Sequence, residues 1–385
     1  MAFGRKNKVN LNPLSYNICL LGESKCGKTT LIKEVCEKLT GEDGYLFLET
    51  GMERGADAIE GINYVNCPEW WYDYDELTNS IGFADVCDDI IENKTTEYAS
   101  LQVVVIDTYD HVLEIAEKEA LRLYNKECRD TGHPEKIAKT INQSWGGFYR
   151  GEKKALDMIL DYIAQLKQVG VSTIVIGHVK TKDLTDAVTG ENYQILTSDQ
   201  QSFYFNALKK NLHFLGLAYI DRTIIKEKTG KKNITTKKEE TINKITSETR
   251  KVRFRDDSYT VDSGSRFANI VPEIDMNADD FIKALTDAIE CERQKSGKTL
   301  KESQIEQQKL EKAEYERVIA KEKENKMQKE LDEIISQIVD FFAENKSDLN
   351  MIKPIMTKVK ELGYTNPKEI SSLEDAKVVL AEILR

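Results

Sequence analysis

The sequence predicts an α/β fold with a mostly parallel β-sheet, followed by a long charged helix and a small C-terminal helical module. Short apolar runs, typical of strands buried on both faces, alternate with amphipathic helical patterns. A glycine-containing turn joins the first apolar run to the first helical pattern. Beyond about residue 275 the composition changes, and Lys, Glu and Gln become dominant. These three observations together favour one large sheet-containing core with helical appendages.

The expected core elements follow in chain order. Apolar runs predict strands, and the amphipathic patterns between them predict helices. Two later segments, 216–228 and 250–261, alternate at period two and are expected to be antiparallel or edge strands. The earlier strands are expected at 16–22, 45–50, 101–108 and 171–178, with helices at 28–39 and 151–170.

The predicted domain scheme divides the chain into four parts. A basic tail at 1–13 lacks the apolar stretch of a signal peptide. The core spans 14–275 and is followed by a charged helical linker at 276–332, whose apolar residues are sparse. The module at 333–385 is expected from amphipathic helical patterns at 331–346, 350–363 and 372–385.

Composition limits the class of protein. The chain has 385 residues, of which 31% are charged, and a net charge of -11, which argues against indiscriminate binding of polyanions but allows a local basic patch. Its seven cysteines include no C-x-x-C pair, and its four histidines do not cluster with them. Reduced thiols in a cytoplasmic protein are therefore expected, and no apolar run approaches the length of a membrane span.

The turn "GESKCGKT" at 22–29 matches the phosphate-binding pattern G-x-x-x-x-G-K-[ST]. It follows a predicted strand and opens a predicted helix, so its backbone N–H groups and the helix start can bind a nucleotide's phosphates. Lys28 is expected to bridge the β- and γ-phosphates, and the Thr29 hydroxyl to bind Mg²⁺. The predicted nucleotide-binding residues are Gly22, Glu23, Ser24, Lys25, Cys26, Gly27, Lys28, Thr29 and Thr30.

Asp107 ends the apolar run 101–108 and is the second predicted metal ligand, on a strand expected beside that of the phosphate-binding turn. The next residue is Thr108, where many nucleotide-hydrolysing enzymes carry the glutamate that activates water. A carboxylate from another strand end must then take that role. The candidates are Glu53, which we place first, and Glu49; the alternative is that both are ordinary surface acids.

His178 ends the run 171–178, at the edge of the sheet where ligands bind. A polar side chain there can sense the γ-phosphate and transmit its presence to the following loop. The alternative is a histidine that only caps a strand end.

The segments 22–29, 45–53, 103–108 and 174–183 together resemble the RecA-like ATPase core over residues 14–275. They are most similar to phage-encoded, single-domain RecA-like ATPases of single-strand annealing and recombination. By this resemblance Lys28 and Thr29 match Walker A, Asp107 matches Walker B, and His178 matches the polar sensor of the fourth core strand. The uncertain glutamate register at 49–54 and the charged C-terminal arm depart from the family pattern.

The resemblance implies Mg²⁺-dependent ATP hydrolysis by a homo-oligomeric ring or filament that binds single-stranded DNA, in a bacterial host's cytoplasm if the chain is phage-encoded. Two loops, at 129–152 and 179–202, would contact DNA. Aromatic and basic side chains there suit base stacking and phosphate contacts, although a turn packed on the core is the alternative. The predicted DNA-binding residues are Trp145, Tyr149, Arg150, Lys180 and Lys182.

Two further basic features remain. The segment 222–255 carries twelve Lys or Arg residues against four Glu, and is either a hairpin arm for a phosphate backbone or a solvated insertion. The RecA-like resemblance also implies that a neighbouring subunit supplies a catalytic cation. Arg266 is the residue that we expect in this role, with Arg253 and Arg222 as weaker candidates and an ordinary surface arginine as the alternative.

Other functions stay open at the level of sequence. The phosphate-binding turn also permits a small-molecule or nucleotide kinase, or a non-hydrolysing nucleotide switch or scaffold. The C-terminal helices are expected to recruit another replication or recombination protein.

Overall fold

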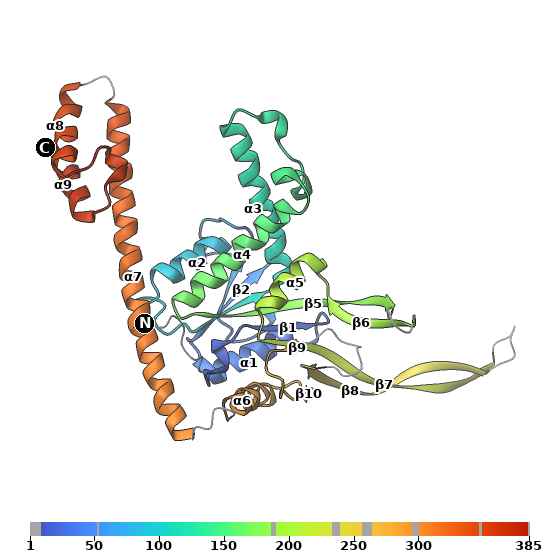
Figure 1. Cartoon of the computed structure of the whole chain (residues 1–385). Coiled ribbons are helices and arrows are strands. Elements are labelled where there is room, and N and C mark those ends of the chain that lie inside the picture. Colours follow the sequence, from blue (N-terminus) through green and yellow to red (C-terminus); the bar gives the residue numbers. More distant parts are fainter. Residues whose placement is uncertain are drawn as a thin grey trace.

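The computed structural model has a central β-sheet with helices on both faces, and a long helix that leads to a small C-terminal module (Figure 1). This arrangement confirms the predicted fold class. The structure describes residues 9–51, 54–185, 190–232, 239–255, 264–294, 300–345 and 349–383.

Six neighbouring strands of the sheet run parallel, in the spatial order β7-β1-β5-β4-β2-β3. Antiparallel strands extend the sheet beyond β7 and pair with β5. The parallel strands are β1 (Ile18–Gly22), β2 (Tyr45–Thr50), β3 (Tyr64–Cys67), β4 (Val103–Asp107), β5 (Ser172–Thr185) and β7 (Phe214–Lys232); the antiparallel ones are β6 (Asn192–Ser198), β8 (Glu239–Arg253), β9 (Gly264–Ser265) and β10 (Glu273–Asp275).

The sheet order corrects one prediction. Asp107 was expected on a strand directly beside the strand of the phosphate-binding turn, but β5 lies between β1 and β4. The residues Ile174, Val175 and Ile176 of β5 are almost completely buried, which suits a central position with helices on both faces.

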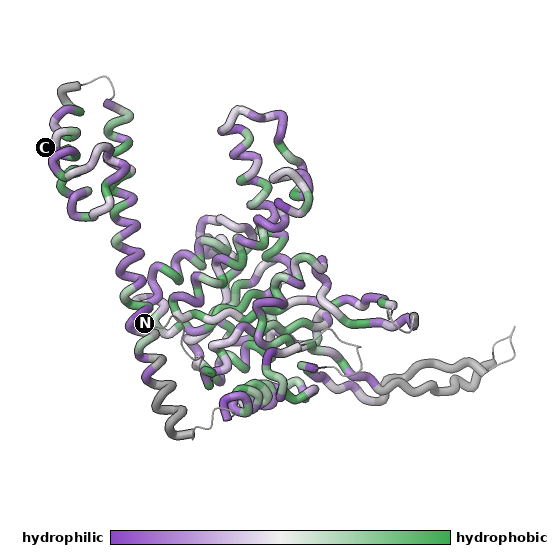
Figure 2. The backbone as a smooth tube through the Cα atoms, in the orientation of Figure 1, coloured by the Kyte–Doolittle hydropathy of each residue, from purple (hydrophilic) through white to green (hydrophobic). Residues whose placement is uncertain are grey.

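Two apolar layers cover the sheet. One contains α2 (Phe83–Glu92), α3 (Tyr109–Asp130), α4 (Arg150–Gln168) and α5 (Ser202–Asn211), and the other contains α1 (Lys28–Thr40) and α6 (Ala278–Gln294). Figure 2 shows hydrophobic residues concentrated in the sheet and these helices. Short 3₁₀ turns complete the described chain at Pro13–Ser15, Ala56–Ala58, Pro134–Lys136, Ile141–Gly146 and Pro367–Glu369.

Helix α6 lies within the segment that the sequence assigned to the charged linker. Its residues Phe281, Leu285 and Ile289 recur at helical spacing and are fully buried against the α1 layer. The core therefore continues past residue 275, and the change in charge composition is a poor guide to where it ends.

The long helix α7 (Leu300–Glu344) touches the core midway along its length. Val318 is buried in the α2–α5 layer, and the carboxylate of Glu322 accepts a hydrogen bond from the Thr95 backbone N–H at 2.8 Å. Most described side chains of α7 before residue 331 are exposed, and the charged, sparsely apolar sequence of this segment did not predict the docking contact. The contact fixes the course of α7 along the core (Figure 1).

The C-terminal module has an apolar cluster of its own. Ile338 at the end of α7, Val359 of α8 (Leu349–Glu361) and Val379 of α9 (Leu373–Ile383) are fully buried in it. The first of its three expected helices is continuous with α7. No helix in the described ranges is long and apolar enough to cross a lipid bilayer.

Two hairpins extend beyond the carboxyl edge of the parallel strands. Strands β5 and β6 pair from Val179↔Ser198 to Thr185↔Asn192, and β7 and β8 pair as far as Lys232↔Glu239. Both hairpins project toward the same side in Figure 1. The described parts of the basic segment 222–255 therefore pair as the two strands of a hairpin, one of the two forms expected for it.

Candidate nucleotide site

The turn at 22–29 joins β1 to α1 at the carboxyl edge of the sheet. Gly22 is required by packing, because a Cβ at this position would lie 2.7 Å from the Ala218 carbonyl oxygen of β7. Gly27, at the start of α1, has φ 102°, a conformation that favours glycine. The turn thus presents its backbone and the amino end of α1 at this edge, as a phosphate-binding loop does.

Lys28 is the buried cation of this turn. Its side chain lies in the first turn of α1, and only 6% of its surface is exposed. The Nζ atom donates hydrogen bonds to the carbonyl oxygens of Gly22, at 3.1 Å, and Glu23, at 2.8 Å. These bonds hold the ammonium group within the turn, where a bound phosphate would meet it.

The two predicted metal ligands lie together. The Thr29 hydroxyl donates a 2.7 Å hydrogen bond to Oδ2 of Asp107, although 78 positions separate them in sequence. Asp107 ends β4, and its partner in register on the adjacent strand β2 is Glu49. Three oxygen-bearing side chains therefore converge beside the turn.

Glu49 is a buried carboxylate with one unused oxygen. Its Oε1 atom accepts a hydrogen bond from the Ala56 N–H at 2.8 Å, whereas Oε2 is buried and has no partner among the described residues. A Cβ at Gly55 would contact both Glu49 Oε1 and Thr29 Oγ1, at 3.6 and 3.8 Å, so both atoms border the same space. Burial raises the pKa of Glu49, and the charge of Asp107 adds to this effect.

Of the two carboxylates considered for activating water, the structure brings Glu49 to the site. Glu53 lies outside the described residues. The sequence required a carboxylate from the end of another strand. That strand is β2, which pairs with β4, and its last residues, Glu49 and Thr50, are both buried.

The oxygen donors at this site fit a magnesium ion. Mg²⁺ prefers hard oxygen ligands and is usually held by one or two carboxylates together with a substrate's phosphates. Thr29 and Asp107 supply a hydroxyl and a carboxylate, and Glu49 has a buried oxygen atom that a metal-bound water could satisfy.

His178 joins a network that the sequence did not predict. It is the register partner of Gly22, and both its backbone N–H and its Nδ1 atom lie within hydrogen-bond distance of Asp110 Oδ2, at 3.0 and 2.8 Å. Gln200 donates to the other oxygen of Asp110 at 2.8 Å. Burial raises the pKa of Asp110, but these hydrogen bonds outweigh it and hold the pKa below its usual value. The position of Asp110 three residues after Asp107, in the first turn of α3, was the available signal.

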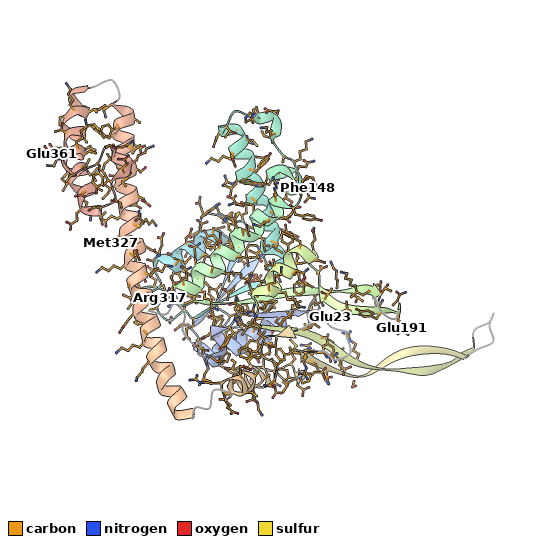
Figure 3. All side chains as sticks on the ribbon, viewed as in Figure 1. Glu23, Phe148, Glu191, Arg317, Met327 and Glu361 are labelled. Atoms are coloured by element: carbon orange, nitrogen blue, oxygen red, sulfur yellow. The ribbon has the colours of Figure 1, made fainter. Side chains whose placement is uncertain are left out.

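The predicted DNA-binding residues occupy two separate projections. Lys180 and Lys182 are exposed on the β5–β6 hairpin. Tyr149 and Arg150 lie at the start of α4, and the Tyr149 ring stacks on Phe203 at 5.7 Å. Figure 3 labels Phe148, which precedes α4, and Glu191 on the β5–β6 hairpin. Phe148 is one of the aromatic residues of the first predicted DNA-contacting loop, and its side chain is 93% exposed.

Trp145 is placed differently from its neighbours. Its ring packs against Tyr124 of α3, with centroids 5.5 Å apart, and its indole N–H points to the Ala120 carbonyl oxygen at 3.4 Å. This is the packed-turn alternative that the sequence left open. Its DNA-binding role stays a prediction.

Arg266 lies away from the nucleotide turn of its own chain. It follows β9, which pairs with the amino end of β7, at the opposite edge of the sheet. Its guanidinium donates to the backbone carbonyls of Leu212 and Lys210. Its expected role toward a neighbouring subunit stays a prediction.

The two weaker candidate arginines also bond to other residues of the chain. Arg253 bonds to Glu273 and Tyr219, whereas Arg222 pairs with Glu248. Neither side chain is brought to the nucleotide turn of its own chain by these contacts.

Comparison with known proteins agrees with this geometry. A family model described as an AAA domain matches residues 14–244, which is more than half of the chain. No curated protein matches the sequence. The matched range contains the phosphate-binding turn, Glu49, Asp107 and His178. The chain therefore belongs to the AAA domain family and is a P-loop ATPase.

Proposed function

We propose that this ATPase hydrolyses ATP with Mg²⁺ while acting on single-stranded DNA, in recombination or replication of the phage type. The observation that carries the proposal is the strand order. Strand β1, which ends in the phosphate-binding turn, lies between β5 and β7, and both of these strands continue past that turn as hairpins. The hairpin at 222–255 concentrates positive charge in an otherwise acidic chain, which suits a phosphate backbone.

The residues at the turn suit in-line hydrolysis. Bound Mg²⁺ would neutralise charge on the phosphate oxygens. Lys28 would bind the β- and γ-phosphates, and Thr29 with Asp107 would hold the metal. Glu49 has an unpartnered oxygen with which to orient water and accept its proton, and its raised pKa favours proton acceptance.

The network around Asp110 offers a route from nucleotide to DNA. His178 stands at the root of the β5–β6 hairpin, and Gln200 follows the end of β6. Both residues bond to the one carboxylate of Asp110, so the two ends of the hairpin share an anchor. A γ-phosphate that shifts His178 would therefore change the orientation of the hairpin.

DNA contacts would involve base stacking as well as charge. Phe148 and the stacked pair Tyr149–Phe203 expose aromatic surface, which stacks on bases of any sequence. Assembly into a homo-oligomeric ring or filament, and recruitment of another replication protein by the C-terminal helices, are further parts of the proposal.

The test is ATP turnover by the full chain, with and without single-stranded DNA, over a range of salt concentrations. We expect DNA to stimulate turnover, and we expect DNA affinity to fall by about 10³ or more between roughly 50 and 200 mM salt if several phosphates are bound. Lys28→Ala should abolish turnover in every condition.

Turnover that ignores DNA, together with no DNA binding at low salt, would refute the DNA part and leave the ATPase intact. Transfer of phosphate to a small acceptor without DNA would instead indicate the kinase alternative.

A further inference from the structure

Arg250 lies on β8, and its side chain is on the face of the sheet that α1 and α6 cover. Alternate residues of a strand point to the same face of the sheet. Val252 and Phe254 are fully buried in the α1–α6 layer, so Arg250, two residues earlier, points to that face as well. Its register partner on β7 is Ile220, which also packs against this layer.

The Arg250 side chain lies where the apolar α1–α6 layer meets the phosphate-binding turn. A Cβ at Gly27 would lie 3.2 Å from the Nη1 atom of Arg250, and 3.8 Å from the terminal methyl group of Met276. The guanidinium therefore lies against the turn, beside the first residue of α1. The backbone is held there as well, because the Met276 N–H donates to the Arg250 carbonyl oxygen at 2.9 Å.

Among the described residues, no acidic side chain pairs with this guanidinium to account for its position. Its neighbours Lys251 and Arg253 are paired with Glu273, and Arg222 is paired with Glu248. Within the described ranges, no hydrogen bond or ion pair joins the Arg250 side chain to another residue.

The other positive charges near the Arg250 guanidinium favour the binding of an anion beside it. The amino end of a helix is the positive end of its dipole, and Lys28 adds a second positive charge in the same turn. The Arg250 side chain is exposed, so solvent screens much of its repulsion from these charges, and an anion bound at the turn would turn the repulsion into attraction. Its rigid donor fork matches the oxygens of a phosphate group.

We propose that Arg250 binds a phosphate oxygen of the nucleotide held by its own subunit, supplying a second cation opposite Lys28. This inference rests on the proposed nucleotide site. It also assigns the base of the β7–β8 hairpin a direct contact with the nucleotide. Because coupling between two ligands is reciprocal, DNA bound to this hairpin changes nucleotide affinity by the same factor as nucleotide changes DNA affinity.

The experiment compares nucleotide binding by full-length variants, with Mg²⁺ and without DNA, using a fluorescent ATP analogue. Arg250→Ala should weaken binding about tenfold or more, because it removes a charge-assisted hydrogen bond. Arg250→Lys should fall between the wild type and the alanine variant, because it keeps the charge and loses the fork. Arg317→Ala is the matched control, since it removes the same side chain from the exposed surface of α7, away from the nucleotide turn and both hairpins, and should bind like the wild type.

The outcomes separate this inference from the proposed function. Equal affinities for wild type, Arg250→Ala and Arg317→Ala would overturn the role of Arg250 while the nucleotide site stands. A wild-type chain that binds no nucleotide would overturn both. Thermal unfolding without nucleotide monitors folding. If Arg250→Ala is unfolded, the nucleotide affinity of Arg250→Lys is compared with that of Arg317→Lys, and equal affinities would again overturn the role of Arg250.

Discussion

Glu49 and Asp107 are neighbours in register, but their surroundings assign them different chemistry. Asp107 accepts a hydrogen bond from the Thr29 hydroxyl, which holds its carboxylate beside the first turn of α1. Glu49 keeps one buried oxygen without a partner. Burial and the nearby Asp107 charge raise its pKa, so the carboxylate gains basicity compared with a solvated glutamate.

Replacing Glu49 by Gln should therefore stop hydrolysis without preventing nucleotide binding. We expect kcat to fall by about 10²–10⁴, the usual contribution of a positioned general base, while the Kd for ATP stays near the wild-type value. Steady-state turnover and nucleotide titration measure the two quantities. Glu53→Gln is the comparison variant and should retain activity; the reverse pattern would assign the base to Glu53.

The sequence predicted a functional site best where the residues of that site are adjacent in the chain. The turn at 22–29 could be predicted because glycine, lysine and threonine have fixed positions in a phosphate-binding loop. The role of Arg250 could not be predicted, because its contact with Gly27 depends on the register of β8 against β7 and on the pairing of β7 with β1. Local sequence encodes neither.

At the scale of elements, the existence of strands was easier to predict than their order. The apolar runs that became β4 and β5 have similar composition, so nothing local indicates that β5 separates β4 from β1. For helix α6, the difficulty was to recognise that the helix belongs to the core. Its buried stripe of Phe281, Leu285 and Ile289 was obscured by the charged residues on its other face.

The amino ends of β1 and β7 meet at His213, which gives this edge of the sheet a pH dependence. The Asn17 backbone N–H donates to His213 Nδ1 at 3.2 Å, so the neutral ring is the bound form. Burial, with the charges of Lys167 and Arg266, lowers the pKa of His213 from 6.5 to about 4.

Between these two pKa values the unfolded chain binds the proton more readily than the folded one. Stability from His213 is thus complete above pH 6.5 and is lost as the pH falls toward 4. We expect the free energy of unfolding to fall more steeply over this interval in the wild type than in His213→Asn. Denaturant titrations at several pH values measure the difference, and parallel curves would contradict the assignment.

At the scale of the whole molecule, α7 is anchored by few residues. Glu322 is only 3% exposed, binds the Thr95 N–H and pairs with Lys326. Val318 supplies the nearby apolar contact. Apolar residues are so sparse along α7 that its sequence gave no reason to expect a docked helix.

Removing the Glu322 carboxylate should loosen this attachment. Glu322→Ala leaves a backbone N–H without its partner, which costs about 1–3 kcal/mol where the group stays buried. Limited trypsin digestion should cut α7 sooner in this variant, and chemical denaturation should show the lower stability. Glu324→Ala, on the exposed surface of the same helix, is the control; equal digestion rates for both variants would rule out the anchoring role.

The 45 residues of α7 correspond to a rod roughly 68 Å long. It carries the terminal module to the side of the molecule away from the two hairpins (Figure 1). A protein that bound to that module, as we propose, would be kept apart from the nucleotide turn. It could act on turnover from a distance, by delivering a substrate to the hairpins or by straining α7 where Val318, Glu322 and Lys329 contact the core.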